Sequence, residues 1–217
     1  MKKQIAPSIL SADFSKLDDE IRAVEKAEAD LLHIDIMDGH FVPNLTMGPP
    51  IVQSIRKMTK MILDCHLMIE HPMQFIEAFQ KAGADWISVH GETCDLSKVL
   101  PAIKNLGCKA GIAINPATPL EKIYPHLVLA DFVVVMTVNP GFGGQNLVDG
   151  TLEKTAALKK YLTEKNLNIP IEVDGGIKLH NIATAAQSGA DIFVSGSGIF
   201  HTQDYSKTIQ EMKKLLH

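Results

Sequence analysis

The sequence predicts a single (β/α)8 TIM barrel that spans residues 1–217 as one domain. Eight short apolar runs alternate with amphipathic stretches along the chain, a pattern typical of parallel strands joined by helical crossovers. Glycine follows three of the predicted helices, at Gly83, Gly107 and Gly189, where a left-handed C-cap is expected before the next strand. An open doubly wound sheet is the alternative, but the glycine-rich turn expected after its first strand is absent.

The first four strand–helix units occupy the first half of the chain. Apolar runs predict strands at 5–9 (IAPSI), 31–37 (LLHIDIM), 61–67 (MILDCHL) and 86–90 (WISVH). The amphipathic stretches that follow them predict helices at 15–27, 50–58, 72–82 and 96–106. The third and fourth of these helices end at the glycines just named.

The last four units follow the same order. Strands are predicted at 109–114 (KAGIAI), 132–137 (FVVVMT), 169–174 (IPIEVD) and 192–195 (IFVS), and helices at 120–127, 149–165, 178–188 and 206–216. Active sites of such barrels lie at the C-terminal ends of the strands, so polar residues there are the candidate functional residues.

Composition and charge narrow the function classes. The chain is 46% hydrophobic and 21% charged, with a formal net charge of −4, so nothing favours nucleic acid or a membrane surface as a partner. Cys65, Cys94 and Cys108 are odd in number and lack metal-ribbon or redox spacing, which indicates a reduced, cytoplasmic location. Pro7 and Asp13 interrupt the apolar N-terminal stretch, which makes it a poor signal peptide.

Histidine and aspartate on three predicted strands indicate a metal site. Side chains alternate along a strand, so His33 and Asp35 share the inward face of the second strand. His66 takes a similar place on the third strand, and Asp174 ends the seventh. Two imidazoles and two carboxylates suit one divalent ion such as zinc, iron(II), manganese or cobalt. Hydrogen-bonded polar residues without an ion are the alternative, but unpaired inward carboxylates are costly to bury.

The same alternation of side chains along a strand shows which neighbouring residues share the face of the proposed ligands. Cys65 lies beside His66 but on the opposite face, so it is excluded as a ligand. Asp64 and Glu172 lie one layer below the proposed ligands and are predicted to orient them. His90 is interpreted as a cap of the fourth strand. Lysine and arginine are absent from the inward faces of the second, third, sixth and seventh strands, which counts against Schiff-base chemistry.

Glycine-rich turns after three successive strands indicate an anion site. Backbone N–H groups in such turns, together with helix N-termini, bind a phosphate dianion without a basic side chain. A turn without a ligand is the alternative for any one glycine pair. The residues concerned are Gly141, Phe142, Gly143 and Gly144 after the sixth strand, Gly175 and Gly176 after the seventh, and Gly196 and Ser197 after the eighth.

Three methionines accompany the proposed ligands. Met37 and Met68 share faces with the histidines and aspartates, and Met136 lies late on the sixth strand. They either pack in the core or form a soft apolar lining that excludes water from a reacting carbon.

The motifs that carry these residues resemble those of the ribulose-phosphate 3-epimerase family. The matching segments are APSIL at 6–10, HIDIMDGHFVPNLT at 33–46, CHLMI at 65–69, VNPGFGGQ at 138–145 and VDGGI at 173–177, and the resemblance extends from about residue 5 to about residue 200. Cys65, Thr137, Leu147 and Gly198 depart from the commonest family pattern, and none of them removes a proposed ligand.

The resemblance implies a barrel of the ribulose-phosphate-binding type and a specific activity. The activity is the reversible epimerisation of D-ribulose 5-phosphate to D-xylulose 5-phosphate at C3, through a metal-stabilised 2,3-enediolate, with Asp35 and Asp174 as the acid and base. It implies one divalent ion per subunit, Zn²⁺ foremost and Fe²⁺, Mn²⁺ or Co²⁺ as alternatives, on His33, Asp35, His66 and Asp174. It also implies a homo-oligomer and a role in the pentose phosphate pathway. Implied substrate contacts are Ser8, His66, Gly141, Phe142, Gly143, Gly144, Asp174, Gly175, Gly176, Gly196 and Ser197.

Two other functions stay open at this point. The segments 64–66 (DCH) and 136–138 (MTV) also resemble relatives that epimerise a hexulose 6-phosphate such as allulose 6-phosphate, although the intact glycine motifs favour the pentulose. A non-catalytic phosphate-binding or metal-storage barrel is the alternative outside the enzymes. It predicts phosphate binding without exchange of the C3 proton.

Overall fold

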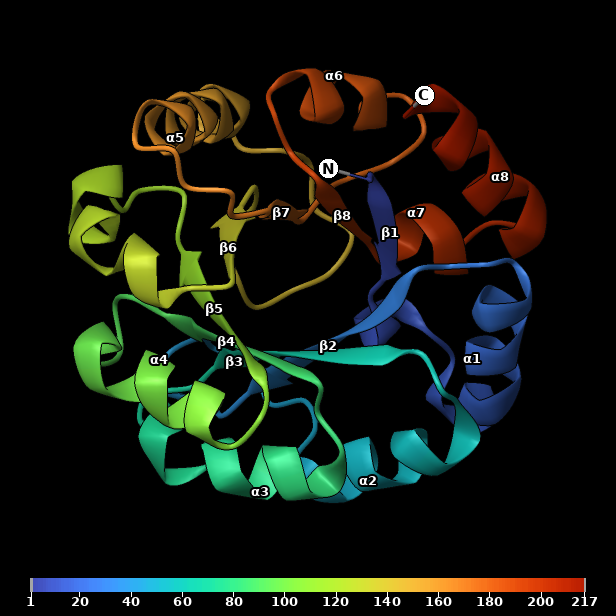
Figure 1. The fold of residues 1–217 in the computed structure, drawn as a ribbon. Coiled ribbons are helices and arrows are strands. Elements are labelled where there is room, and N and C mark those ends of the chain that lie inside the picture. The colour runs from blue at the N-terminus through green and yellow to red at the C-terminus, as the bar shows by residue number, and fades with distance from the viewer. Residues whose placement is uncertain (1, 217) are drawn as a thin grey trace.

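The computed structural model describes residues 2–216 as a ring of parallel strands surrounded by helices (Figure 1). The strands are β1 Gln4–Pro7, β2 Leu31–Met37, β3 Ile62–Met68, β4 Trp86–His90, β5 Lys109–Ile114, β6 Phe132–Met136, β7 Ile171–Asp174 and β8 Ile192–Ser195. Their order in the sheet is β1-β8-β7-β6-β5-β4-β3-β2, and each neighbouring pair is parallel. The predicted (β/α)8 barrel is confirmed.

The helices follow the strands on the outside of the ring. The α-helices are α1 Leu17–Lys26, α2 Pro49–Met58, α3 Ile76–Ala82, α4 Leu96–Asn105, α5 Thr151–Glu164, α6 Ile182–Gln187, α7 Ser197–Phe200 and α8 Tyr205–Leu215. Short 3₁₀-helices are η1 Ile9–Ser11, η2 Phe14–Lys16, η3 Pro72–Gln74, η4 Leu120–Lys122 and η5 Tyr124–Leu129.

Several sequence predictions are wrong in detail: the α-helices predicted at 72–82 and 178–188 begin at Ile76 and Ile182. The α-helix predicted at 120–127 is a pair of 3₁₀-helices, because Pro125 has no N–H group and its ring blocks a continuous α-helix. The strand predicted at 5–9 ends at Pro7, since Ser8 accepts the N–H of Leu10 and starts η1 instead. The predicted left-handed glycine caps are confirmed, with φ of +105° at Gly83 and +100° at Gly189.

The barrel closes between β1 and β2 through a few specific contacts. Ser8 and His33 form a single parallel bridge. The backbone N–H of Asp30 donates to the Ile5 carbonyl at 3.0 Å, and the Asp30 carboxylate accepts the Ile5 N–H at 3.0 Å. These contacts satisfy the backbone groups that an open sheet edge would expose.

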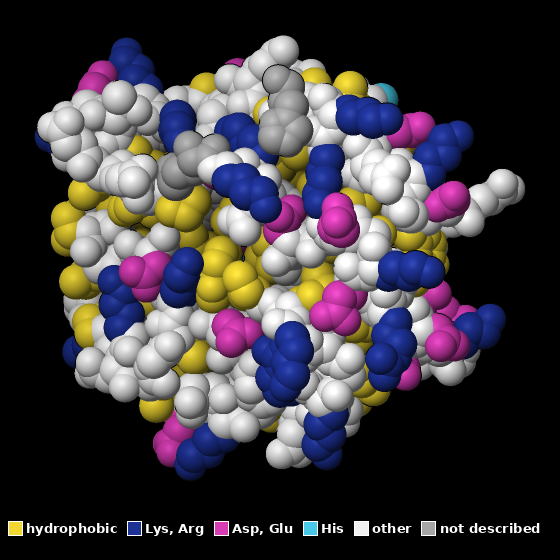
Figure 2. All heavy atoms as spheres, turned by 45° about the vertical axis from the view of Figure 1, so that its right-hand side comes forward, with side chains coloured by type: hydrophobic (Ala, Val, Ile, Leu, Met, Phe, Trp, Pro, Cys, Tyr) yellow, Lys and Arg dark blue, Asp and Glu magenta, His cyan; other side chains and the backbone are white. Residues whose placement is uncertain are grey.

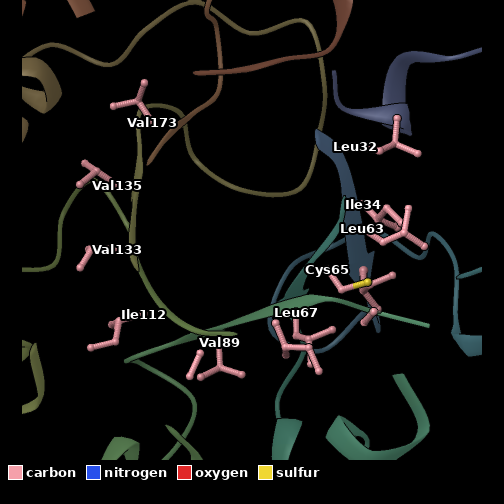
Figure 3. Packing of buried hydrophobic residues seen from close by; sticks show 14 of the residues in the cluster. Leu32, Ile34, Leu63, Cys65, Leu67, Val89, Ile112, Val133, Val135 and Val173 are labelled. Carbon is pink, nitrogen blue, oxygen red and sulfur yellow. The ribbon is translucent and has the colours of Figure 1, made fainter. Parts of the chain in front are cut away.

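Apolar side chains fill two layers separated by the strands. The inner layer includes Ala6, Leu31, Trp86, Phe132 and Val134. The outer layer packs the strands against the helices, and Figure 3 shows the sulfur of Cys65 among Ile34, Leu63 and Leu67 in this layer. Cys65 therefore lies on the outer face, as its parity predicts.

The surface carries mixed charge. On the face shown in Figure 2, basic and acidic side chains are interspersed, and neither sign covers a continuous region. Within residues 2–216, none of the helices combines the length and the apolar character needed to cross a membrane.

Candidate metal centre and anion site

Four side chains from three strands meet at the C-terminal end of the barrel. The register of β2 and β3 sets Asp35 opposite His66, and Asp174 ends β7. His33 Nε2 lies 3.4 Å from Asp35 Oδ1 and 3.6 Å from Asp174 Oδ2. His66 Nδ1 lies 3.4 and 3.3 Å from the same two oxygens. The sequence prediction that these residues gather at one point is confirmed.

This arrangement fits a divalent cation. Donor atoms about 2.0–2.1 Å from a tetrahedral ion lie about 3.4 Å from one another, which matches the separations in this structure. Within residues 2–216, the buried nitrogens His33 Nε2 and His66 Nδ1 have no hydrogen-bond partner. Buried imidazole nitrogens that face two carboxylates form a donor set suited to zinc, iron(II), manganese or cobalt.

Two further carboxyl groups lie below the ligands, where strand parity predicts them. His33 Nδ1 is 2.7 Å from Asp64 Oδ2 and 3.0 Å from Glu172 Oε1. When Nδ1 donates its hydrogen to a carboxylate, the lone pair of Nε2 faces the centre, as in other histidine metal ligands. Asp64 makes the hydrogen bond to His33 Nδ1, and a hydrogen on Nδ1 would leave the Nε2 lone pair free to face the candidate metal centre.

The electrostatics favour positive charge at the centre. Burial lowers the pKa of His66, but the close contacts of its Nδ1 with the carboxylates of Asp174 and Asp35 outweigh burial and raise that pKa to about 9. Burial raises the pKa of Asp35, yet the neighbouring imidazoles bring it below its ordinary value. Burial and the charge of Asp64 raise the pKa of Glu172 to about 8, so Glu172 keeps its proton at pH 7. A cation that binds here displaces protons from the imidazoles.

An open cleft lies above the candidate metal centre, and its empty space, which includes solvent at the mouth, is about 520 Å³. Asp35 and Asp174 reach its floor, whereas His33 and His66 have no exposed surface and lie beneath it. Apart from those two histidines, all the predicted site residues line it: Ser8, Asp35, Met37, Met68, Met136, Gly141, Phe142, Gly143, Gly144, Asp174, Gly175, Gly176, Gly196 and Ser197. Ser8 Oγ donates to Asp35 Oδ2 at 2.5 Å and holds the carboxylate in place.

The glycine-rich side of the cavity is the candidate anion site. Its lining residues include no lysine or arginine, so a phosphate group there would rely on backbone N–H groups. Gly175 and Gly176 have φ of +114° and +70°, and a Cβ atom on Gly176 would lie 2.9 Å from Leu147 N. The turn after β7 therefore packs directly on the loop after β6.

Several residues of the site were missed by the sequence analysis. Ser11 and Gln145 also line the cavity, and each follows a predicted strand closely enough to have been a candidate. His90 does end β4, but its interpretation as a strand cap alone missed its contact with His66. His90 points into the barrel, with Nε2 2.9 Å from His66 Nε2, and its parity with Ser88 and Trp86 on β4 was the available signal. Burial lowers the pKa of His90 to about 4, so its ring is neutral at pH 7.

Comparison with known proteins identifies sequence relatives. The model of the ribulose-phosphate 3 epimerase family matches residues 4–200. Ribulose-phosphate 3-epimerase of Synechocystis sp. is 49% identical over 208 residues, which cover 94% of this chain and 90% of that protein. The Bacillus subtilis ribulose-phosphate 3-epimerase is 47% identical over 212 residues, covering 97% of this chain and 98% of that protein.

Solved structures share the fold at low identity. KGPDC from Streptococcus mutans has a TM-score of 0.74 at 12% identity, over 100% of this chain and 98% of that one. A 3-hexulose-6-phosphate synthase has a TM-score of 0.69 at 20% identity over the whole of both chains. These likenesses support the barrel architecture alone.

Proposed function

The chain belongs to the ribulose-phosphate 3-epimerase family of isomerases, and on that premise we propose that it interconverts D-ribulose 5-phosphate and D-xylulose 5-phosphate. One observation carries the proposal: Asp35 and Asp174 face the same cavity from β2 and β7, on a centre whose donor atoms suit a divalent ion. Epimerisation at C3 requires two acid–base groups, one on each side of the reacting carbon.

Asp35 and Asp174 perform the proton transfers. One carboxylate removes the C3 proton, and the other carboxyl group returns a proton to the opposite face of the planar 2,3-enediolate. The roles of the two aspartates exchange for the reverse reaction. β1 and β8 separate β2 from β7 around the barrel, so the two carboxyl groups approach from different directions.

The remaining residues hold the substrate and shape the site. A divalent ion on His33, Asp35, His66 and Asp174 would stabilise the negative charge that develops on the sugar oxygens. Gly144, Gly176, Gly196 and Ser197 hold the phosphate group through backbone N–H groups. Met37, Met68 and Met136 line the cavity and exclude water from the reacting carbon.

Three further features complete the proposal. We assign Zn²⁺ as the metal, because its tetrahedral preference matches donor separations of 3.3–3.6 Å. The three free cysteines support a reducing cytoplasm as the location. A homo-oligomer, which the family resemblance implies, stays a prediction.

The test is the uptake of deuterium at C3 of ribulose 5-phosphate in D₂O, followed by NMR. We expect the deuterium content at C3 to rise as xylulose 5-phosphate forms. Binding of the phosphate ester without exchange would instead indicate a non-catalytic barrel. The same assay with a hexulose 6-phosphate compares kcat/KM for the two substrates, and a higher value for the hexulose would overturn the pentulose assignment.

A further inference from the structure

A chain of hydrogen bonds leads from His66 away from the metal centre. His66 Nε2 and His90 Nε2 are 2.9 Å apart, and His90 Nδ1 is 3.2 Å from Glu92 Oε2. The rings of His66 and His90 are inclined by only 21° with centroids 5.0 Å apart. With the two nitrogens between the centroids, the rings meet edge to edge, the geometry of an N–H···N hydrogen bond.

The positions of the hydrogens follow from this geometry. Two imidazole nitrogens in contact share one hydrogen, so one ring donates and the other accepts. If His66 binds the metal through Nδ1, its Nε2 carries the hydrogen and donates to His90. His90 then carries its own hydrogen on Nδ1 and donates to Glu92. This order leaves His66 Nδ1 with a free lone pair toward Asp35 and Asp174.

Glu92 ends this chain of hydrogen bonds, and other hydrogen bonds hold its carboxylate in place. Its Oε1 accepts the Asn115 backbone N–H at 2.9 Å and the hydroxyl of Thr118. Burial raises the pKa of Glu92, but the hydrogen bond from His90 and those from the loop outweigh it and lower that pKa to about 2. Lys154 Nζ donates to the carbonyls of Asn115, at 3.0 Å, and Thr118, which holds the same loop on α5.

We propose that His90 and Glu92 are positioning residues that fix the tautomer and ring orientation of His66 for metal binding. The two histidine ligands are then held differently. His33 donates directly to the Asp64 carboxylate at 2.7 Å, whereas His66 reaches a carboxylate only through a second histidine. Outer hydrogen-bond partners of metal ligands raise ligand basicity and reduce ligand motion. This inference rests on the proposed metal site.

Zinc affinity, measured by competition with a chromophoric chelator, tests the proposal. His90→Phe fills the space but removes the acceptor, and we expect about 10- to 100-fold weaker binding. His90→Gln places an amide oxygen near the position of Nε2, so we expect it to recover most of the affinity. Ser88→Ala is the matched control, because Ser88 lies on the same inward face of β4 and its buried hydroxyl has no partner within residues 2–216.

The visible absorption of bound Co²⁺ reports ligand geometry independently of activity. We expect a changed spectrum in His90→Phe and an unchanged one in Ser88→Ala. Thermal unfolding of the metal-free proteins checks that each variant folds. If His90→Phe does not fold, Glu92→Gln carries the test, with an expected loss of about threefold or more.

The outcomes distinguish the positioning role of His90 and Glu92 from the proposed metal site itself. Wild-type affinity and spectrum in both His90→Phe and Glu92→Gln would overturn the positioning role and leave the metal site intact. Failure of the wild-type protein to bind Zn²⁺ or Co²⁺ at all would overturn the metal site and, with it, this inference.

Discussion

The four proposed ligands are buried although some of their polar atoms lack hydrogen-bond partners, a combination that is unfavourable in protein interiors. His33, Asp35, His66 and Asp174 are almost fully buried, yet two imidazole nitrogens have no hydrogen-bond partner within residues 2–216. Burying unpaired polar atoms destabilises a fold unless another interaction compensates for the lost solvation. A bound cation would supply that compensation, so a metal site here would reduce the stability of the metal-free protein.

Replacing either central aspartate tests its acid–base role. We expect Asp35→Asn and Asp174→Asn each to lower kcat by about 10²- to 10⁴-fold, since an amide neither accepts nor returns the C3 proton. The assay uses saturating Zn²⁺, and the bound metal is quantified because both residues are also proposed ligands. Activity within about tenfold of wild type in both variants would contradict the scheme with two aspartates.

Replacing the two carboxyl groups below His33 is predicted to weaken Zn²⁺ binding to different extents. We expect Asp64→Asn to weaken Zn²⁺ binding about 10- to 100-fold, because Asp64 makes the shorter contact, 2.7 Å, with His33 Nδ1. Glu172→Gln should cost less, because the pKa of about 8 leaves Glu172 neutral at pH 7 and an amide replaces a neutral group. Chelator competition on both variants measures the difference. A larger loss in Glu172→Gln would reverse this ranking.

At the scale of elements, the cavity is lined by the strand ends and the loops that follow them. The loops after β6 and β7 are in contact because Gly175 and Gly176 have no side chain, and Val138 and Leu147 occupy the space that a Cβ would need. Strands were located from sequence to within two residues, since apolar runs of this length are a local signal. The paired 3₁₀-helices at 120–129 were not, because one proline overrode an otherwise helical pattern.

Adding one methyl group to the β7 turn tests this packing. We expect Gly176→Ala to strain the turn by about 1–3 kcal/mol and to raise KM for the sugar phosphate roughly tenfold, because the new Cβ meets backbone atoms of the β6 loop. Steady-state kinetics measure KM. Gly107→Ala is the control, since Gly107 also has a positive φ but no atom within 4 Å of its would-be Cβ. An unchanged KM in Gly176→Ala would contradict the proposed phosphate site.

At the scale of the whole molecule, the barrel closes between β1 and β2 through a few contacts. Within residues 2–216, seven of the eight neighbouring strand pairs form ladders, whereas β1 and β2 meet through the Ser8–His33 bridge, the hydrogen bond from Ser8 to Asp35, and the backbone and side chain of Asp30. Because His33 is both a proposed ligand and the closing residue, the centre is assembled only when the barrel is closed.

The Asp30 carboxylate allows this closure to be tested away from the centre. We expect Asp30→Ala to lower the free energy of unfolding by about 1–3 kcal/mol, because the Ile5 N–H loses its acceptor. Urea unfolding of the metal-free protein measures the change. Lys2→Ala is the control, since it removes only the ion pair of Asp30 with an exposed lysine and should leave the free energy of unfolding nearly unchanged. Equal stability of Asp30→Ala and wild type would show that the other contacts suffice for closure.

The sequence by itself determined that the proposed ligands point into the barrel, because alternation along a strand is local and needs no knowledge of the partner strand. That was enough to group His33, Asp35, His66 and Asp174 and to exclude Cys65. Only the tertiary structure decided that His90 contacts His66, because that contact depends on the register of β3 against β4. The ligand separations of 3.3–3.6 Å and the closure at Asp30 likewise depend on how the eight strands fit together, which no single segment encodes.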